Sequence, residues 1–155
     1  MIAQEFITKI EGHGALNIDW ANKKAQLKIL EGERLFEGLL NGRPAKDAPW
    51  ITARICGVCP IAHNLASLKA VEAAFGIIPN RTTILLRKLM MASQIIQSHT
   101  LHLFFLALPD YLGLDSGLEL AKKKPEFFKI AVNLKEIGDQ ISQIVAGRGI
   151  HPTTT

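Results

Sequence analysis

Two cysteines, Cys56 and Cys59, stand three positions apart in the string R-I-C-G-V-C-P-I-A-H, which also contains Arg54 and His63. At a helix start this spacing lets both sulfur atoms point at one soft metal ion, and the thiolate is the form that binds. His63 lies one helical turn beyond Cys59, on the same face. A thiol pKa falls at a helix N-terminus and near cations, so we expect Arg54 and the backbone N–H groups after Cys59 to favour the thiolate. The string predicts a shared site for metal or redox chemistry.

The cysteine spacing alone is compatible with several kinds of site. A disulfide would close so small a ring that it would restrict the unfolded chain very little, so a structural disulfide is not expected. A thioredoxin-like redox pair expects a βαβ pattern, whereas helices are predicted on both sides of these cysteines. A structural zinc or iron–sulfur site needs further Cys or His ligands, and the sequence has no third cysteine. A small thiol-redox or zinc-binding protein stays open as an alternative.

The residues before the cysteines alternate between apolar and polar side chains in three short stretches. These stretches cover residues 6–10, 16–20 and 25–30, and turn-forming residues at 11–14 and 22–24 separate them. Alternation with a period of two is typical of strands that bury one face. We expect them to form a small antiparallel sheet at the N-terminus.

Helical periodicity follows, and it predicts four main helices at residues 33–40, 61–75, 82–108 and 125–145. Residues 45–50 are expected to be a proline-containing connection, so that the cysteines lie at a loop-to-helix junction. Pro109 and Asp110 are expected to end the third helix, and Gly138 is a weak point in the last one. The expected fold class is mainly α and multi-helical. It is a single domain over residues 1–155, with the small antiparallel sheet at 1–30 and helices at 31–155.

The composition argues against several classes of function. Lysine and arginine (18) slightly outnumber aspartate and glutamate (14), but the basic residues are scattered, so nucleic-acid binding is not expected. The first residues have no basic stretch followed by an apolar one, which argues against a secretory signal. The most apolar segment, residues 82–108, contains Arg87 and Lys88 and is expected to be a buried helix, not a membrane span. A cytoplasmic protein is the expectation.

The longer string around the cysteines, R-x-C-G-x-C-x-x-x-H, resembles the N-terminal signature of nickel–iron (NiFe) hydrogenase large subunits. Further strings agree with this family in the same order along the chain: K-I-E-G-H at 9–13, L-F-E-G-L-L-N-G-R-P at 35–44, S-H-T-L-H to L-P-D at 98–110, and G-R-G-I-H-P at 147–152. The resemblance covers essentially the whole chain. It is strongest to the cytoplasmic, cofactor-coupled group of these enzymes, and it implies the fold of a hydrogenase large subunit.

The resemblance implies a catalytic nickel–iron centre. In the family the first cysteine of the signature is a terminal nickel ligand and the second bridges nickel and iron, which gives these roles to Cys56 and Cys59 respectively. Soft thiolates suit both metals. The iron carries CO and cyanide ligands, and the centre catalyses H₂ oxidation or proton reduction by heterolytic splitting of H₂. The implied partner is a small subunit whose iron–sulfur clusters receive the electrons.

Four further residues take roles from the resemblance. Glu11 matches a glutamate that relays protons beside a cysteine ligand, and His63 matches a histidine that can hydrogen-bond the bridging sulfur. Glu37 matches a carboxylate that helps to bind magnesium, which prefers oxygen ligands. Arg54 is expected to hold the loop or a subunit contact. Without the resemblance, Glu11 would be an exposed strand-end carboxylate and Glu37 an ordinary helix residue, and a surface role for Arg54 would be equally acceptable.

Two more histidines, His99 and His102, stand three positions apart, which is a possible ligand spacing. The resemblance assigns them no metal. We expect both to be polar groups within a packed helix face, and Met90 to fill the core on the same helix.

The sequence departs from the family pattern at the metal site. The family supplies two more cysteine ligands from a D-P-C-x-x-C element, and the 155 residues contain none. The magnesium site likewise lacks its C-terminal ligands. We therefore expect the N-terminal part of a large subunit that is inactive alone. Its apolar helix faces should be exposed where the remaining C-terminal part or the small subunit would cover them.

An alternative from another functional class is a non-catalytic interaction module of the same fold. It would be comparable to the respiratory complex I subunit that resembles hydrogenases and has lost the metal. The presence of both Cys56 and Cys59 speaks against that loss.

Overall fold

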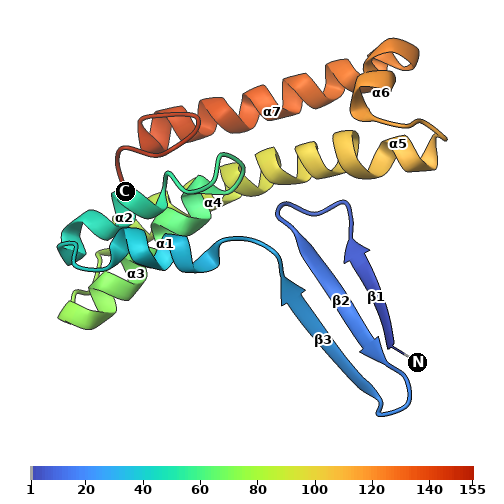
Figure 1. Cartoon of the computed structure of the whole chain (residues 1–155). Helices are drawn as coiled ribbons and strands as arrows, with labels where there is room; N and C mark the ends of the chain where they lie inside the picture. Colours follow the sequence, from blue (N-terminus) through green and yellow to red (C-terminus); the bar gives the residue numbers. More distant parts are fainter. Residues whose placement is uncertain (1) are drawn as a thin grey trace.

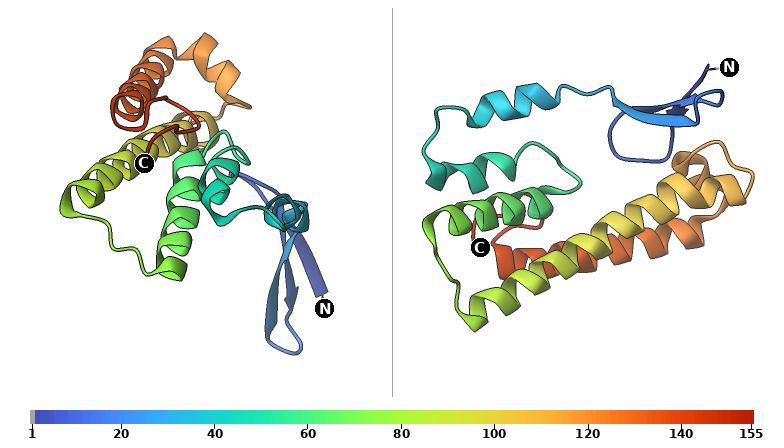
Figure 2. Two further views of the ribbon diagram at one scale, coloured as in Figure 1. Left: turned by 90° about the vertical axis from the view of Figure 1, so that its left-hand side faces the viewer. Right: turned by 90° about the horizontal axis from the view of Figure 1, so that it is seen from below.

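The computed structural model describes the backbone of residues 2–155 and the side-chain environments of residues 5–32 and 35–155. Three strands come first, β1 (Ile2–Ile7), β2 (Gly14–Asp19) and β3 (Lys24–Ile29), and helices follow. Figures 1 and 2 show the sheet extending away from the helical part of the molecule. The described chain therefore has the expected order of a small sheet followed by helices.

The sheet is antiparallel, with the strand order β1-β2-β3. Leu16 pairs with Leu27 in the register, so apolar side chains share one face, as the period of two predicted. At the turn between β2 and β3, the Asp19 carboxylate accepts hydrogen bonds from the side-chain amide and the backbone N–H of Asn22. These bonds lower the pKa of Asp19. The predicted antiparallel sheet is confirmed.

Three of the predicted helices are confirmed nearly to their ends: α1 (Glu33–Leu40), α3 (Pro60–Phe75) and α7 (Pro125–Ala146). Both α3 and α7 begin with proline, whose fixed φ suits the first helical position and whose missing N–H is not needed there. The α3 helix ends at Gly76, whose φ of +66° is a left-handed conformation that glycine adopts without strain.

Short helices were missed by the sequence analysis. The segment 45–50, predicted to be a connection, contains a 3₁₀ turn (Ala45–Asp47) and the start of α2 (Ala48–Thr52). Another short helix, α6 (Gly117–Lys123), precedes α7. Such segments span two helical turns or fewer, so no repeating apolar face can be recognised in their sequence. The prediction of only four main helices was therefore incomplete.

The longest apolar segment differs from its prediction in two ways. It forms α4 (Arg81–Leu101), continues as a π-helical segment (His102–Ala107) and ends as α5 (Leu108–Tyr111), so Pro109 does not end it. Pro109 occupies the start of α5, where its missing N–H costs little. The segment is also not buried, because several large apolar side chains on α4 are between 41% and 54% exposed: Ile84, Leu85, Leu86, Leu89 and Ile95.

Helices α4 and α7 lie side by side along most of their lengths (Figures 1 and 2). Gly138 makes this close approach possible, because a Cβ atom there would lie 2.6 Å from Cγ of Gln97 and 3.2 Å from the main-chain oxygen of Ser93. The hydroxyls of Ser93 and Ser142 are 2.7 Å apart in the same interface. The expected weak point at Gly138 is thus a packing site inside α7.

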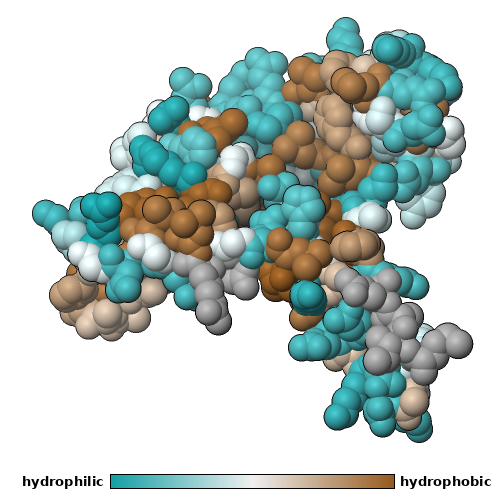
Figure 3. Space-filling view, viewed as in Figure 1, coloured by the Kyte–Doolittle hydropathy of each residue, from teal (hydrophilic) through white to brown (hydrophobic). Residues whose placement is uncertain are grey.

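The buried apolar residues form two small clusters. One contains Ile61, Leu65, Met90 and Ala146, which confirms the core position of Met90, and the other contains Phe104, Leu114, Leu120 and Ala131. Much apolar surface remains exposed, as predicted, and Figure 3 shows one such area over α1 and α2. In residues 2–155, no helix combines the length and the apolar character that crossing a membrane requires.

Candidate metal centre

The two cysteines lie where α2 ends and α3 begins. Residues 53–59, here called the cysteine loop, connect these helices, and Pro60 opens α3. The N–H of His63 donates to the main-chain oxygen of Cys59 at 3.3 Å, so the histidine lies in the first turn of α3. The ligand atoms of Cys56, Cys59 and His63 all lie within 4.8 Å of one another. No other group of three potential ligands occurs among the residues whose side chains the structure describes.

These distances fit one cation. With metal–ligand bonds of about 2.0–2.3 Å, ligand atoms of a tetrahedral site lie roughly 3.5 Å apart. The three side chains would need only small rotations to reach that spacing. Two sulfurs and one imidazole favour a soft or borderline metal such as nickel or zinc.

The sulfur of Cys56 is the centre of a small polar cluster. The backbone N–H groups of Val58 and Cys59 each donate to it at 3.4 Å. The Cys56 thiol in turn donates to Oε1 of Glu11, 3.9 Å away, although Glu11 belongs to the connection between β1 and β2. The structure therefore brings Glu11 to the cysteines, as the sequence analysis expected of a residue working beside a cysteine ligand.

Cys59 does not favour the thiolate, contrary to our expectation. Burial raises the pKa of Cys59 to about 12, and a hydrogen bond to Cys56 and the negative charges of Cys56 and Glu11 add to the effect. Arg54 does not counteract these effects, because its guanidinium donates to the main-chain oxygen of Trp50 at 2.8 Å. A bound cation would offset the same repulsion and deprotonate the thiol. The donor set therefore fits a metal ion.

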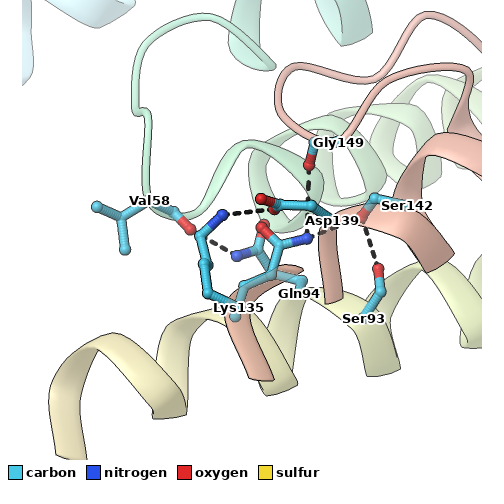
Figure 4. A network of polar contacts seen from close by, with 8 residues as sticks. Val58, Ser93, Gln94, Lys135, Asp139, Ser142 and Gly149 are labelled. Atoms are coloured by element: carbon cyan, nitrogen blue, oxygen red, sulfur yellow. Dashed lines mark hydrogen bonds and ion pairs between the residues drawn. The ribbon is translucent and has the colours of Figure 1, made fainter. Parts of the chain in front are cut away.

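Residues that the sequence analysis missed fix the cysteine loop. The Gln94 side chain of α4 accepts from the N–H of Ile61 at 3.1 Å and donates to the main-chain oxygen of Val58 at 2.5 Å. His151 Nδ1 lies 2.7 Å from the main-chain oxygen of Ala53. Figure 4 shows Gln94 and Val58 beside the polar contacts between α4 and α7. The available signal was a row of polar residues at helical spacing on the apolar α4: Ser93, Gln94, Gln97 and Thr100.

Other candidate residues lie apart from the cysteines or differ from expectation. Glu37 is exposed on α1 and is not part of the three-ligand group. His99 and His102 are exposed as well, so their predicted place within a packed helix face was wrong. The reason is that the buried stripe of α4 runs through Met90, Ser93, Gln97 and Thr100, and neither histidine lies on it.

Comparison with known proteins was made on the whole chain. A family model described as nickel-dependent hydrogenase matches residues 34–144. The alpha subunit of sulfhydrogenase 2 from Pyrococcus furiosus is 40% identical over 97% of this chain and 37% of its own length. A subunit of the F420-non-reducing hydrogenase vhu from Methanocaldococcus jannaschii is 39% identical over 99% of this chain and 39% of its own length.

Solved structures agree with these matches. An NAD⁺-reducing NiFe-hydrogenase in the H₂-reduced state superposes with a TM-score of 0.78 and 33% identity, covering 97% of this chain and 37% of that one. The Ni-Fe-Se hydrogenase of Desulfomicrobium baculatum gives a TM-score of 0.72 at 25% identity, again with 37% of its chain covered. The chain thus spans less than two fifths of the length of these relatives. The matched family model, the identities and the shared fold together show that the chain belongs to the nickel-dependent hydrogenase family.

Proposed function

We propose that this chain supplies the first two thiolate ligands of a nickel–iron centre that catalyses H₂ oxidation or proton reduction. The observation that carries the proposal is the convergence of Cys56, Cys59 and His63 within 4.8 Å. Family membership adds that these two cysteines match the positions that bind nickel in such enzymes. Cys56 is the terminal nickel ligand in this proposal, and Cys59 is the ligand shared with iron.

When bound, the centre with its CO- and cyanide-bearing iron supplies the position at which H₂ is split. The chain's own residues orient the ligands and move protons. The N–H groups of Val58 and Cys59 hold the sulfur of Cys56 in place. Oε1 of Glu11, 3.9 Å from that sulfur, accepts a proton and passes it away from the site.

His63 and Arg54 act beside the ligands in this proposal. The imidazole of His63 is close enough to both sulfurs to donate a hydrogen bond to Cys59, which tunes a metal-bound thiolate. Arg54 holds the end of α2 through its bond to Trp50. Glu37 is proposed as one carboxylate ligand of magnesium, with its other ligands outside these residues.

The proposed activity needs partners. Two ligands are too few for the centre, so the remaining C-terminal part of a large subunit would supply the others, and an iron–sulfur small subunit would take up the electrons. The exposed apolar side chains of α1 and α4 fit such burial. The relatives named as F420-non-reducing and NAD-reducing hydrogenases support a cytoplasmic location and the cofactor-coupled group.

The ligand assignment is tested by metal analysis of the purified chain after incubation with Ni²⁺ and gel filtration. We expect nickel in the original chain and loss of most of it in Cys56→Ser and Cys59→Ser. His99→Ala, which changes an exposed histidine away from the site, is the matched control and should retain nickel. Equal nickel in the original chain and Cys56→Ser would remove the assignment.

A second measurement tests the need for partners. The 155-residue chain alone should give no H₂-dependent dye reduction. Dye reduction by the chain alone, with nickel and iron bound, would contradict this expectation.

A further inference from the structure

The side chain of Gln94 bridges the two ends of the turn that contains Cys59. Its amide oxygen accepts from Ile61 N–H at 3.1 Å, and its amide nitrogen donates to Val58 oxygen at 2.5 Å. A backbone oxygen can only accept and a backbone N–H can only donate, so these partners fix which way the amide points. The two bonds, here called the Gln94 bridge, therefore hold the backbone on both sides of one cysteine.

Gln94 is almost completely buried, with 4% of its surface exposed. A buried amide stabilises a structure only when its polar atoms are paired, and leaving one unpaired is costly. Both amide atoms of Gln94 are paired with the cysteine segment and come from a helix distant in sequence (Figure 4). The bridge therefore transmits the rigid position of α4 to the loop.

The geometry points to Gln94 as a positioning residue for the metal site: we propose that its bridge sets the distance and direction of the Cys59 sulfur relative to Cys56. The inference rests on the proposed function in taking both cysteines as metal ligands. Residues 56–59 have few other restraints from α4, because the remaining contacts of the loop come from His151 at Ala53 and from Thr52 at His63. Losing the bridge should allow Cys59 to move while the helices stay packed.

Gln97 provides a matched control one turn further along α4. It is also 4% exposed, and its amide nitrogen contacts the Ser142 hydroxyl at 3.0 Å and the Gly149 oxygen at 3.4 Å. Both of its partners belong to α7 and the turn after it, away from the cysteine loop. Gln94→Met and Gln97→Met remove equally buried amides, but only the first removes the bridge.

The first measurement uses Co²⁺ alone, since thiolate-bound cobalt gives charge-transfer and ligand-field absorption bands that report ligand geometry. We expect Gln94→Met to weaken Co²⁺ binding roughly tenfold and to alter the bands, as loss of supporting contacts does at other metal sites. Gln97→Met should lower the thermal midpoint and leave affinity and bands unchanged. If Gln94→Met does not fold, Gln94→Glu keeps the acceptor for Ile61 and should show a smaller change of the same kind.

The second measurement needs no metal. Dibromobimane becomes fluorescent when it links two nearby thiols, whereas monobromobimane reports each thiol separately. Gln94→Met should reduce the Cys56–Cys59 link several-fold at unchanged total thiol labelling, and Gln97→Met should not. If the original chain binds no cobalt but the link still depends on Gln94, the metal proposal fails and the positioning inference stands. Original-like bands and linking in Gln94→Met would overturn the inference.

Discussion

The Nε2 atom of His102 lies 2.9 Å from the main-chain oxygen of Lys9, although the two residues are 93 positions apart in the chain. Lys9 makes a second contact with the same helical segment, because its Nζ atom lies 3.0 Å from Oδ1 of Asp110. Its backbone has a φ of +60°, which is unusual for a residue with a side chain. These contacts hold the loop of residues 8–13, and with it Glu11, beside Cys56.

Replacing His102 should loosen this loop. We expect His102→Ala to increase hydrogen–deuterium exchange of residues 8–13 roughly fivefold, which corresponds to about 1 kcal/mol for one lost hydrogen bond. Mass spectrometry of the corresponding peptide measures the exchange. His99→Ala, an exposed histidine on the same helical segment, should leave it unchanged. Equal exchange in both variants would show that the His102 contact does not restrain the loop.

The thiol of Cys59 should react slowly in the metal-free chain. Because its pKa is raised from an ordinary value of 9.0 to about 12, its alkylation by iodoacetamide should increase steeply between pH 9 and 11. Glu11→Gln removes one of the negative charges that raise this pKa and should speed alkylation at a given pH. Peptide mass spectrometry at several pH values provides the measurement, and rapid labelling of Cys59 at pH 8 would contradict the prediction.

The same shift has a consequence for stability. The folded state holds the Cys59 proton more tightly than the unfolded chain, so the stabilising contribution is present below pH 9 and is lost as pH rises towards 12. Urea unfolding at pH 8 and pH 10 should therefore show a larger loss for the original chain than for Cys59→Ser.

The ion pair between Arg87 and Glu72 should contribute strongly to the packing of α4 on α3. Both side chains are nearly buried, at 12% and 13% exposure, and the guanidinium donates to both carboxylate oxygens at 2.9 and 2.7 Å. Arg87→Met leaves the Glu72 charge without this partner, and we expect a loss of roughly 3 kcal/mol in the free energy of unfolding. Urea titration measures it. Arg81→Met, at an exposed position of the same helix, should change it by less than about 0.5 kcal/mol.

Gly138→Ala should destabilise the protein although alanine favours helices. The added Cβ would lie 2.6 Å from Cγ of Gln97, and the resulting overpacking should cost about 1–3 kcal/mol. Gly38→Ala in α1 is the matched control, because nothing lies within 4 Å of its added Cβ. That change should stabilise α1 by roughly 0.5–1 kcal/mol. Thermal unfolding of the two variants should therefore shift in opposite directions.

The sequence was sufficient to predict the elements that have a regular pattern and a clear end. Alternation located the three strands, and Gly76 and the prolines located the ends of α3 and α7. It failed where tertiary contacts decide, as at Pro109, which the chain accepts at the start of α5 after a π-helical segment. The exposed apolar face of α4 could not be distinguished from a buried one, because the same residues suit a core and a surface that another chain covers.

The candidate site was predictable in its ligands and not in its supports. The spacing of Cys56, Cys59 and His63 identified side chains that do converge, and the resemblance led to Glu11. The thiol pKa of Cys59 was predicted in the wrong direction, because burial and neighbouring negative groups cannot be read from the string that surrounds it. Gln94 was missed because its partners are backbone groups, which leave no mark in the sequence.

The contact between His151 and the oxygen of Ala53 joins residues 98 positions apart. On a ribosome, the cysteines emerge long before the residue that fixes the start of their loop has been synthesised. Gln94, which fixes the other part of the loop, also follows the cysteines in the chain. The thiols therefore leave the ribosome in an unformed site, and their final arrangement has to be reached late, after the turn at residues 147–152 has been made.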